Sequence, residues 1–208
     1  MSLESYALIS DVEWRDRFSA GGPQQGANIE AACNAATLAI EARCDRLFVS
    51  RGSITEYHSI GESLGSIYTG QWPIISITTL HEDTTFPRTY TNTALVAGTD
   101  YERVGPDKLR RLASYGPTVW ATGSRVVRLV YTAGYASTSV VPHDLKQVAF
   151  FIAAAMFKES DRKQWGLTAA TDAAGNYQRF AGYFTPAIDE MLNQYVRRDY
   201  HRTWELAA

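Results

Sequence analysis

Residues 61–65 read G-x-S-x-G, with Ser63 at the centre of the motif. In α/β-hydrolases this spacing places a nucleophilic serine on a sharp turn between a buried strand and a helix. Here the residues that follow, 67–70, indicate a second strand, and no alternation of strands and helices surrounds the motif. We interpret the segment as a flexible hairpin or loop and keep a serine hydrolase using Ser63 as the alternative. The expectation is therefore a protein without catalytic residues, not an enzyme.

The other residues that could bind or react do not form a recognised pattern. The four histidines show neither H-x-x-x-H nor H-E-x-x-H spacing, and no cysteine lies near one in the sequence, so we expect no metal site. No glycine-rich phosphate-binding motif occurs, so we expect no cofactor. We expect the histidines to be solvated at the surface. They are His58, His81, His143 and His201.

The composition is that of a folded chain without a general affinity for nucleic acid or membrane. The protein has 208 residues, 45% of them hydrophobic, which is enough for one domain or for one domain with an insertion. The formal net charge of −2 lacks the basic excess that neutralises phosphates. No apolar run approaches the ~20 residues of a membrane span, so we expect no membrane partner. The two cysteines, Cys33 and Cys44, lie about 16 Å apart if helical and should not pair.

The periodicity predicts an α+β fold that is mainly a helical bundle with an inserted antiparallel β-meander. Ser10 and Glu13 form a capping box at the start of the first helix, and Thr185 caps the last helix. The predicted helices lie near 10–18, 27–48, 142–162 and 185–200. The predicted β-rich insertion spans 53–135, a long loop spans 163–183, and a C-terminal tail spans 199–208.

The predicted helix 142–162 is apolar on nearly every side. Such a helix is buried on most of its surface, either within the subunit or against another subunit. The C-terminal segment also mixes arginine with aromatic residues, which dominate the hot spots of protein interfaces. The candidate interface residues are Phe150, Phe151, Phe157, Trp165, Tyr177, Phe180, Arg197, Arg198, Tyr200, Arg202 and Trp204.

One stretch resembles a known family. VYTAGY at 130–135 ends a predicted strand, and after a short spacer VPHDLKQVA at 141–149 opens the long apolar helix. This pattern resembles the head–tail connector proteins of tailed phages and prophages, also called adaptor or head-completion proteins. WPIISI at 72–77 is similar to a strand of that family, and the order of helices and strands agrees. The resemblance covers roughly residues 5–160, and the loop 163–183 and the extended β-region depart from it.

The resemblance implies a structural protein that works by assembly, with all 208 residues forming a single connector domain. Such proteins form a ring, commonly twelve-fold, below the portal, where they extend the DNA channel and join head to tail. The implied partners are other copies of the chain, the portal protein, a downstream neck or tail protein and, transiently, the packaged double-stranded DNA. The implied location is the virion neck, assembled in the host cytoplasm. A different neck or tail-completion protein remains the alternative within this class.

Overall fold

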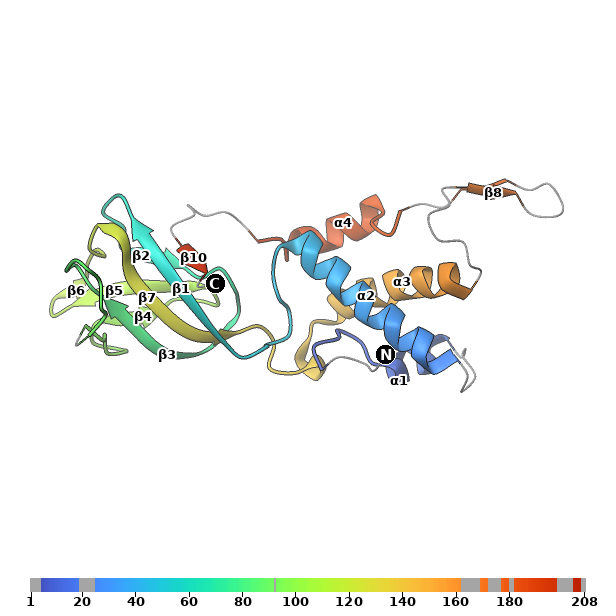
Figure 1. Ribbon diagram of the computed structural model, residues 1–208, viewed down its shortest axis with the longest axis horizontal. Coiled ribbons are helices and arrows are strands. Elements are labelled where there is room, and N and C mark those ends of the chain that lie inside the picture. The colour runs from blue at the N-terminus through green and yellow to red at the C-terminus, as the bar shows by residue number, and fades with distance from the viewer. Residues whose placement is uncertain are drawn as a thin grey trace. The chain divides into compact units, whose positions relative to one another are not determined.

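The computed structural model describes residues 5–18, 25–91, 93–161, 169–171, 177–179, 182–197 and 204–206. Its contacts divide the chain into two compact units. The helical unit comprises Met1–Asp45 and Ser137–Val196, and the β unit comprises Arg46–Ala136 and Arg197–Ala208. Figure 1 shows the helices of the first unit and the sheets of the second. Among the described residues, no helix is long and apolar enough to cross a membrane.

The helical unit is built around three helices from opposite ends of the sequence. Trp14 of α1 lies with its ring centroid 4.9 Å from that of Phe157 on α3. Apolar side chains of α2 and α3, among them Ile40 and Val148, are fully buried. The elements of this unit are α1 (Asp11–Phe18), α2 (Gly26–Cys44), the short 3-10 helix η2 (Thr138–Val140), α3 (His143–Asp161), β8 (Ala169–Thr171), β9 (Tyr177–Arg179) and α4 (Pro186–Asn193).

The helix starts agree with their sequence signals. The Ser10 amide donates to Glu13 Oε2 at 2.9 Å and the Glu13 amide donates to Ser10 Oγ at 3.1 Å, which confirms the capping box. The Ile188 amide donates to Thr185 Oγ1 at 3.4 Å, which confirms the cap of α4. The helix ends agree less well. α2 stops at Cys44, four residues early, because Asp45 adopts a left-handed conformation with φ of 50°.

The β unit holds two antiparallel sheets around a core of its own. The first sheet has the strand order β10-β1-β7-β3, and the second has the order β2-β5-β4 with β6 paired to β5. Trp120, Leu129 and Tyr131 are among the buried side chains of this core. The strands are β1 (Ser53–Ile60), β2 (Ser66–Tyr68), β3 (Ile74–Glu82), β4 (Tyr101–Arg103), β5 (Lys108–Ala113), β6 (Gly116–Pro117), β7 (Gly123–Ala133) and β10 (Trp204–Leu206).

The prediction of a mainly helical bundle is wrong. Among the described residues, helices make up 34% and antiparallel strands 28%, so neither class dominates. Two physical reasons account for the difference. The predicted helices 27–48 and 185–200 extend past the observed helix ends at Cys44 and Asn193. The strands also do not follow one another as a simple meander, because β7 lies between β1 and β3 and so joins strands distant in the sequence.

The segment before β1 and the segment after β7 pair with each other and form a tight corner of the β unit. Within the β unit, Val49 and Tyr135 form a parallel bridge. The Ser50 amide donates to the Tyr135 carbonyl at 3.0 Å, and the Tyr135 amide donates to the Phe48 carbonyl at 2.6 Å. Gly134 makes this approach possible, since it has a φ of +100° and a Cβ there would lie 2.7 Å from the Phe48 carbonyl oxygen.

Candidate binding site on the β unit

The structure places the described candidate interface residues in different environments. Phe157 is buried against Trp14, and Phe150 is buried with the Arg17 guanidinium 4.8 Å from its ring centroid. Phe151 is 48% exposed on α3. Arg197 is half-buried after α4, while Tyr177 and Trp204 belong to β9 and β10. Outside the described residues lie Trp165, Phe180, Arg198, Tyr200 and Arg202, together with most of the expected loop 163–183 and tail 199–208.

Ser63 does not stand at a nucleophile elbow. It is exposed in the loop that joins β1 to β2, and the element that follows is a strand, where the elbow requires a helix. The histidines are not all at the surface either, because His58 on β1 is fully buried with its Nε2 3.6 Å from Glu56 Oε2. Across the part of the chain that the structure describes, no three His, Cys, Asp or Glu side chains are placed to hold a metal ion.

A buried polar network surrounds Glu56. The Tyr131 hydroxyl donates to Glu56 Oε1 at 2.5 Å, and the Gly70 amide donates to the same carboxylate at 3.1 Å. The Tyr131 hydroxyl accepts from the Gln71 amide at 3.1 Å. Burial, and then the neighbouring carboxylate, raise the pKa of Tyr131, so the hydroxyl keeps its proton and remains a donor. This network ties β1 and β7 to the segment before β3 and is closed to solvent, so it is structural.

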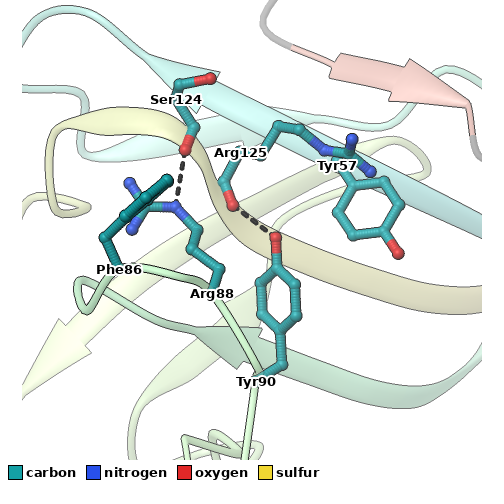
Figure 2. A pocket seen from close by; sticks show the side chains of 6 residues that line it. All are labelled: Tyr57, Phe86, Arg88, Tyr90, Ser124 and Arg125. Carbon is teal, nitrogen blue, oxygen red and sulfur yellow. Dashed lines mark hydrogen bonds between the residues drawn. The ribbon is translucent and has the colours of Figure 1, made fainter.

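The β unit also carries an open hollow of about 390 Å³. Three elements supply its walls: β1, the loop 83–90 that follows β3, and the start of β7. Figure 2 shows the lining side chains, which combine aromatic rings with guanidinium groups. The lining residues are Tyr57, Phe86, Arg88, Tyr90, Ser124 and Arg125.

Asp83 shapes the loop that forms one wall of this hollow. Its carboxylate accepts hydrogen bonds from the Thr85 amide at 2.9 Å, the Thr85 hydroxyl at 2.5 Å, the Thr89 amide at 3.1 Å and the Tyr90 amide at 2.9 Å. These bonds, the one from the Thr85 hydroxyl above all, lower the pKa of Asp83 to about 2. The carboxylate is therefore ionised over the whole physiological range and is occupied by the loop itself.

A bulge at the start of β7 forms the opposite wall. The register between β1 and β7 shifts between His58 and Ile60. Arg125 has a φ of 48° and Tyr90 a φ of 55°, which are strained values for residues other than glycine. The Arg125 amide donates to Ser59 Oγ at 2.9 Å, and its carbonyl accepts from the Tyr90 hydroxyl at 2.6 Å. The two strained residues thus hold each other in place.

Three arginines gather around the two tyrosine rings of this site. The Arg88 Nε donates to the Ser124 carbonyl at 2.6 Å, a bond drawn in Figure 2. The guanidinium carbon of Arg125 lies 3.9 Å from the centroid of the Tyr57 ring, and that of Arg128 lies 4.8 Å from the centroid of Tyr90. None of the salt bridges among the described residues involves these three side chains. We call Arg88, Arg125 and Arg128 the arginine patch.

Sequence reasoning missed this site because its members come from three segments with no fixed spacing. Tyr57 precedes Arg88 by 31 positions and Arg125 by 68 positions. The available signal is weak: an exposed Phe-Pro-Arg in a loop after a strand, and a Gly-Ser-Arg at the start of another strand. Neither segment predicts a site until the sheet order is known.

The comparisons with known proteins concern the fold. The sequence matches no protein-family model and no curated protein. Solved structures do match. A chain from the neck of an empty gene transfer agent (GTA) particle, computed with C6 symmetry, aligns with a TM-score of 0.56 and 18% identity over 94% of this chain and 92% of that one. A chain from the neck of a native GTA particle, computed with C12 symmetry, aligns with a TM-score of 0.56 and 19% identity over 94% and 91%.

A chain from the virion of a native GTA particle aligns with a TM-score of 0.53 and 19% identity, over 94% of this chain and 92% of that one. At this level of identity the likeness establishes the fold. The protein therefore has an α+β fold that also occurs in chains of GTA particles, two of them from the neck, and the likeness extends over both of its units.

Proposed function

We propose that the protein is a structural subunit of the neck of a phage or phage-like particle and acts by assembly. The observation that carries this proposal is the fold match over 94% of the chain to chains of GTA necks. The stretch 130–149, which resembles head–tail connector proteins, supports it independently. In this role copies of the chain form a ring below the portal, extend the DNA channel, contact the packaged DNA transiently and join the head to the next neck or tail protein.

The exposed apolar side chains suit a subunit that is covered by neighbours. A ring uses head-to-tail contacts, so each subunit presents two different surfaces to its two neighbours. Phe151 and Leu38, each 48% exposed, offer apolar contact area on the helical unit. Phe86 offers it on the β unit with 93% exposure. These side chains extend the proposed interface beyond the aromatic and arginine residues of the C-terminal segment.

Electron microscopy of the purified protein, alone and with a phage portal protein, tests the proposal. A closed ring, either free or on the portal, is the expected result. A protein that stays monomeric at high concentration and does not bind portal would refute it. Phe151→Ser should weaken ring formation, because it removes exposed apolar contact area from α3. The fold should be kept, because the side chain lies on the helix surface and its loss opens no core cavity. Val140→Ser, on η2 and 57% exposed, is the matched control.

A further inference from the structure

The arginine patch is a concentration of positive charge on a chain that is otherwise acidic. The whole chain has a formal net charge of −2, and the three arginines contribute +3, so all other residues together contribute −5. Asp83 lies beside the patch but is buried, and its oxygens already accept the hydrogen bonds of its own loop. Among the described residues no ion pair neutralises the patch, and the remainder of a second copy of the chain carries the opposite net charge.

The guanidinium groups of the patch are held in position before any ligand arrives. Arg88 is fixed by two carbonyls, with its Nε 2.6 Å from the Ser124 oxygen and its NH1 3.0 Å from the Thr85 oxygen. Arg125 lies against the Tyr57 ring, and its backbone is fixed on both sides by side chains. A planar guanidinium held in this way donates parallel hydrogen bonds to a carboxylate with little further loss of entropy.

The composition of the site favours a protein ligand over nucleic acid. Among the described residues that line the hollow, all but Ser124 are arginine or aromatic and none is lysine. Arginine, tyrosine and phenylalanine are enriched in the centres of protein interfaces, whereas lysine is depleted there. Phe86 is 93% exposed at the rim, where it would cover a side chain that entered the hollow. The volume of about 390 Å³ suits one or a few side chains.

We infer that this hollow receives an aspartate or glutamate side chain from a second copy of the chain, with Arg125 and Arg88 binding the carboxylate and Phe86 packing over it. The inference rests on the proposed function, because head-to-tail assembly brings this surface of one copy against a different surface of the next. It adds a defined contact to that function: a pocket on the β unit of one subunit and an acidic residue on its neighbour.

A zero-length cross-link tests this contact directly. Arg125→Lys keeps the positive charge and places an amine in the hollow, which a carbodiimide joins only to a carboxylate in direct contact. The variant is prepared as an equal mixture of ¹⁵N-labelled and unlabelled protein under the conditions that give rings. Mass spectrometry of peptides containing residue 125 should show cross-links that join labelled to unlabelled chains. Cross-links confined to a single copy, or rings without any cross-link at position 125, would overturn the inference.

A second measurement separates this inference from the proposed function. Arg125→Ala should raise the protein concentration needed for half-assembly about tenfold or more, as for a central interface arginine. Arg110→Ala is the matched control, because Arg110 also lies on the β unit but is already paired with Glu102 at 3.2 Å. Rings that form equally well with Arg125→Ala overturn the inference and leave the proposed function standing. If the wild-type protein forms no ring, with or without portal, both the inference and the proposed function are wrong.

Duplex DNA provides the competing ligand. Fluorescence anisotropy of a labelled duplex at low salt is measured with the wild-type protein and with Arg125→Ala. Equal and weak binding by both proteins is expected. A loss of DNA affinity in the variant, with ring assembly unchanged, would assign the patch to phosphate groups and overturn the inference.

Discussion

Gly134→Ala should strongly destabilise the β unit. At a φ of +100° an alanine is strained, which costs about 1–3 kcal/mol. Its Cβ would also lie 2.7 Å from the Phe48 carbonyl oxygen and 3.0 Å from the Ser50 amide nitrogen. Both atoms belong to backbone, so the corner must open and weaken its two hydrogen bonds to Tyr135. At about 1 kcal/mol for each bond, the total cost is about 3–5 kcal/mol.

Gly52→Ala separates the backbone strain from the steric clash. Gly52 has a similar φ of +107°, and nothing lies within 4 Å of a Cβ placed there. This control should lose only the strain, about 1–3 kcal/mol. Hydrogen exchange of the central amides of β7 measures the free energy of unfolding of the β unit for both variants. Exchange should be about 30-fold faster for Gly134→Ala than for Gly52→Ala, since about 2 kcal/mol separates them.

The comparison also defines the result that would refute this reasoning. If Gly134→Ala costs no more than Gly52→Ala, the close approach of Gly134 to 48–50 does not hold the corner. The pairing of Val49 with Tyr135 would then contribute nothing to the stability of the β unit.

Three further predictions concern polar groups. The fold lowers the pKa of Asp83 from its ordinary 3.8 to about 2. The stability that the ionised carboxylate contributes is therefore complete above about pH 4 and is lost as the pH falls through about 2. Exchange of the loop amides that it holds should accelerate over that interval, and Asp83→Asn should abolish the pH dependence. Glu56→Ala leaves the buried Tyr131 hydroxyl without its acceptor and should cost about 2–3 kcal/mol in urea unfolding, whereas Glu56→Gln should cost less. Thr185→Ala removes the acceptor of the Ile188 amide and should lower the stability of α4 by about 1 kcal/mol, measured by exchange of that amide.

Sequence reasoning worked where a structure depends on residues a few positions apart. The capping box of Ser10 and Glu13 is an interaction over three residues, and so is the cap made by Thr185. It failed for a helix end that is set by the backbone conformation of a single residue. Asp45, which ends α2, is compatible with a helix in sequence but is left-handed in the structure. It also failed for the sheet order, because the position of β7 between β1 and β3 depends on pairings over long sequence distances.

Burial of polar residues was equally hard to predict. His58 and Glu56 alternate with Tyr57 on β1, and alternation assigns two faces without saying which one is buried. The polar pair lies on the buried face, because Tyr131 and the Gly70 amide satisfy the carboxylate there. Partners from residues 70 and 131 cannot be inferred from the sequence around position 56.

The bulge at the start of β7 explains how the arginine patch arises from an ordinary strand. Regular alternation would direct residues 125 and 128 to opposite faces of the sheet, because they are three positions apart. Yet Arg125 lies over Tyr57 and Arg128 over Tyr90, two rings whose centroids are only 5.7 Å apart. The register shift and the left-handed conformation of Arg125 redirect its side chain to the face that Arg128 occupies.

That conformation is strained, and it persists because side chains from two other elements hold both backbone groups of Arg125. A glycine at this position would adopt the same backbone more easily but would leave the Tyr57 ring without its guanidinium. The strain is therefore the cost of placing a charged side chain at this point. The strongest local signals of the chain specify its helix starts and its corner at Gly134, whereas the candidate site depends on a backbone conformation that those signals do not encode.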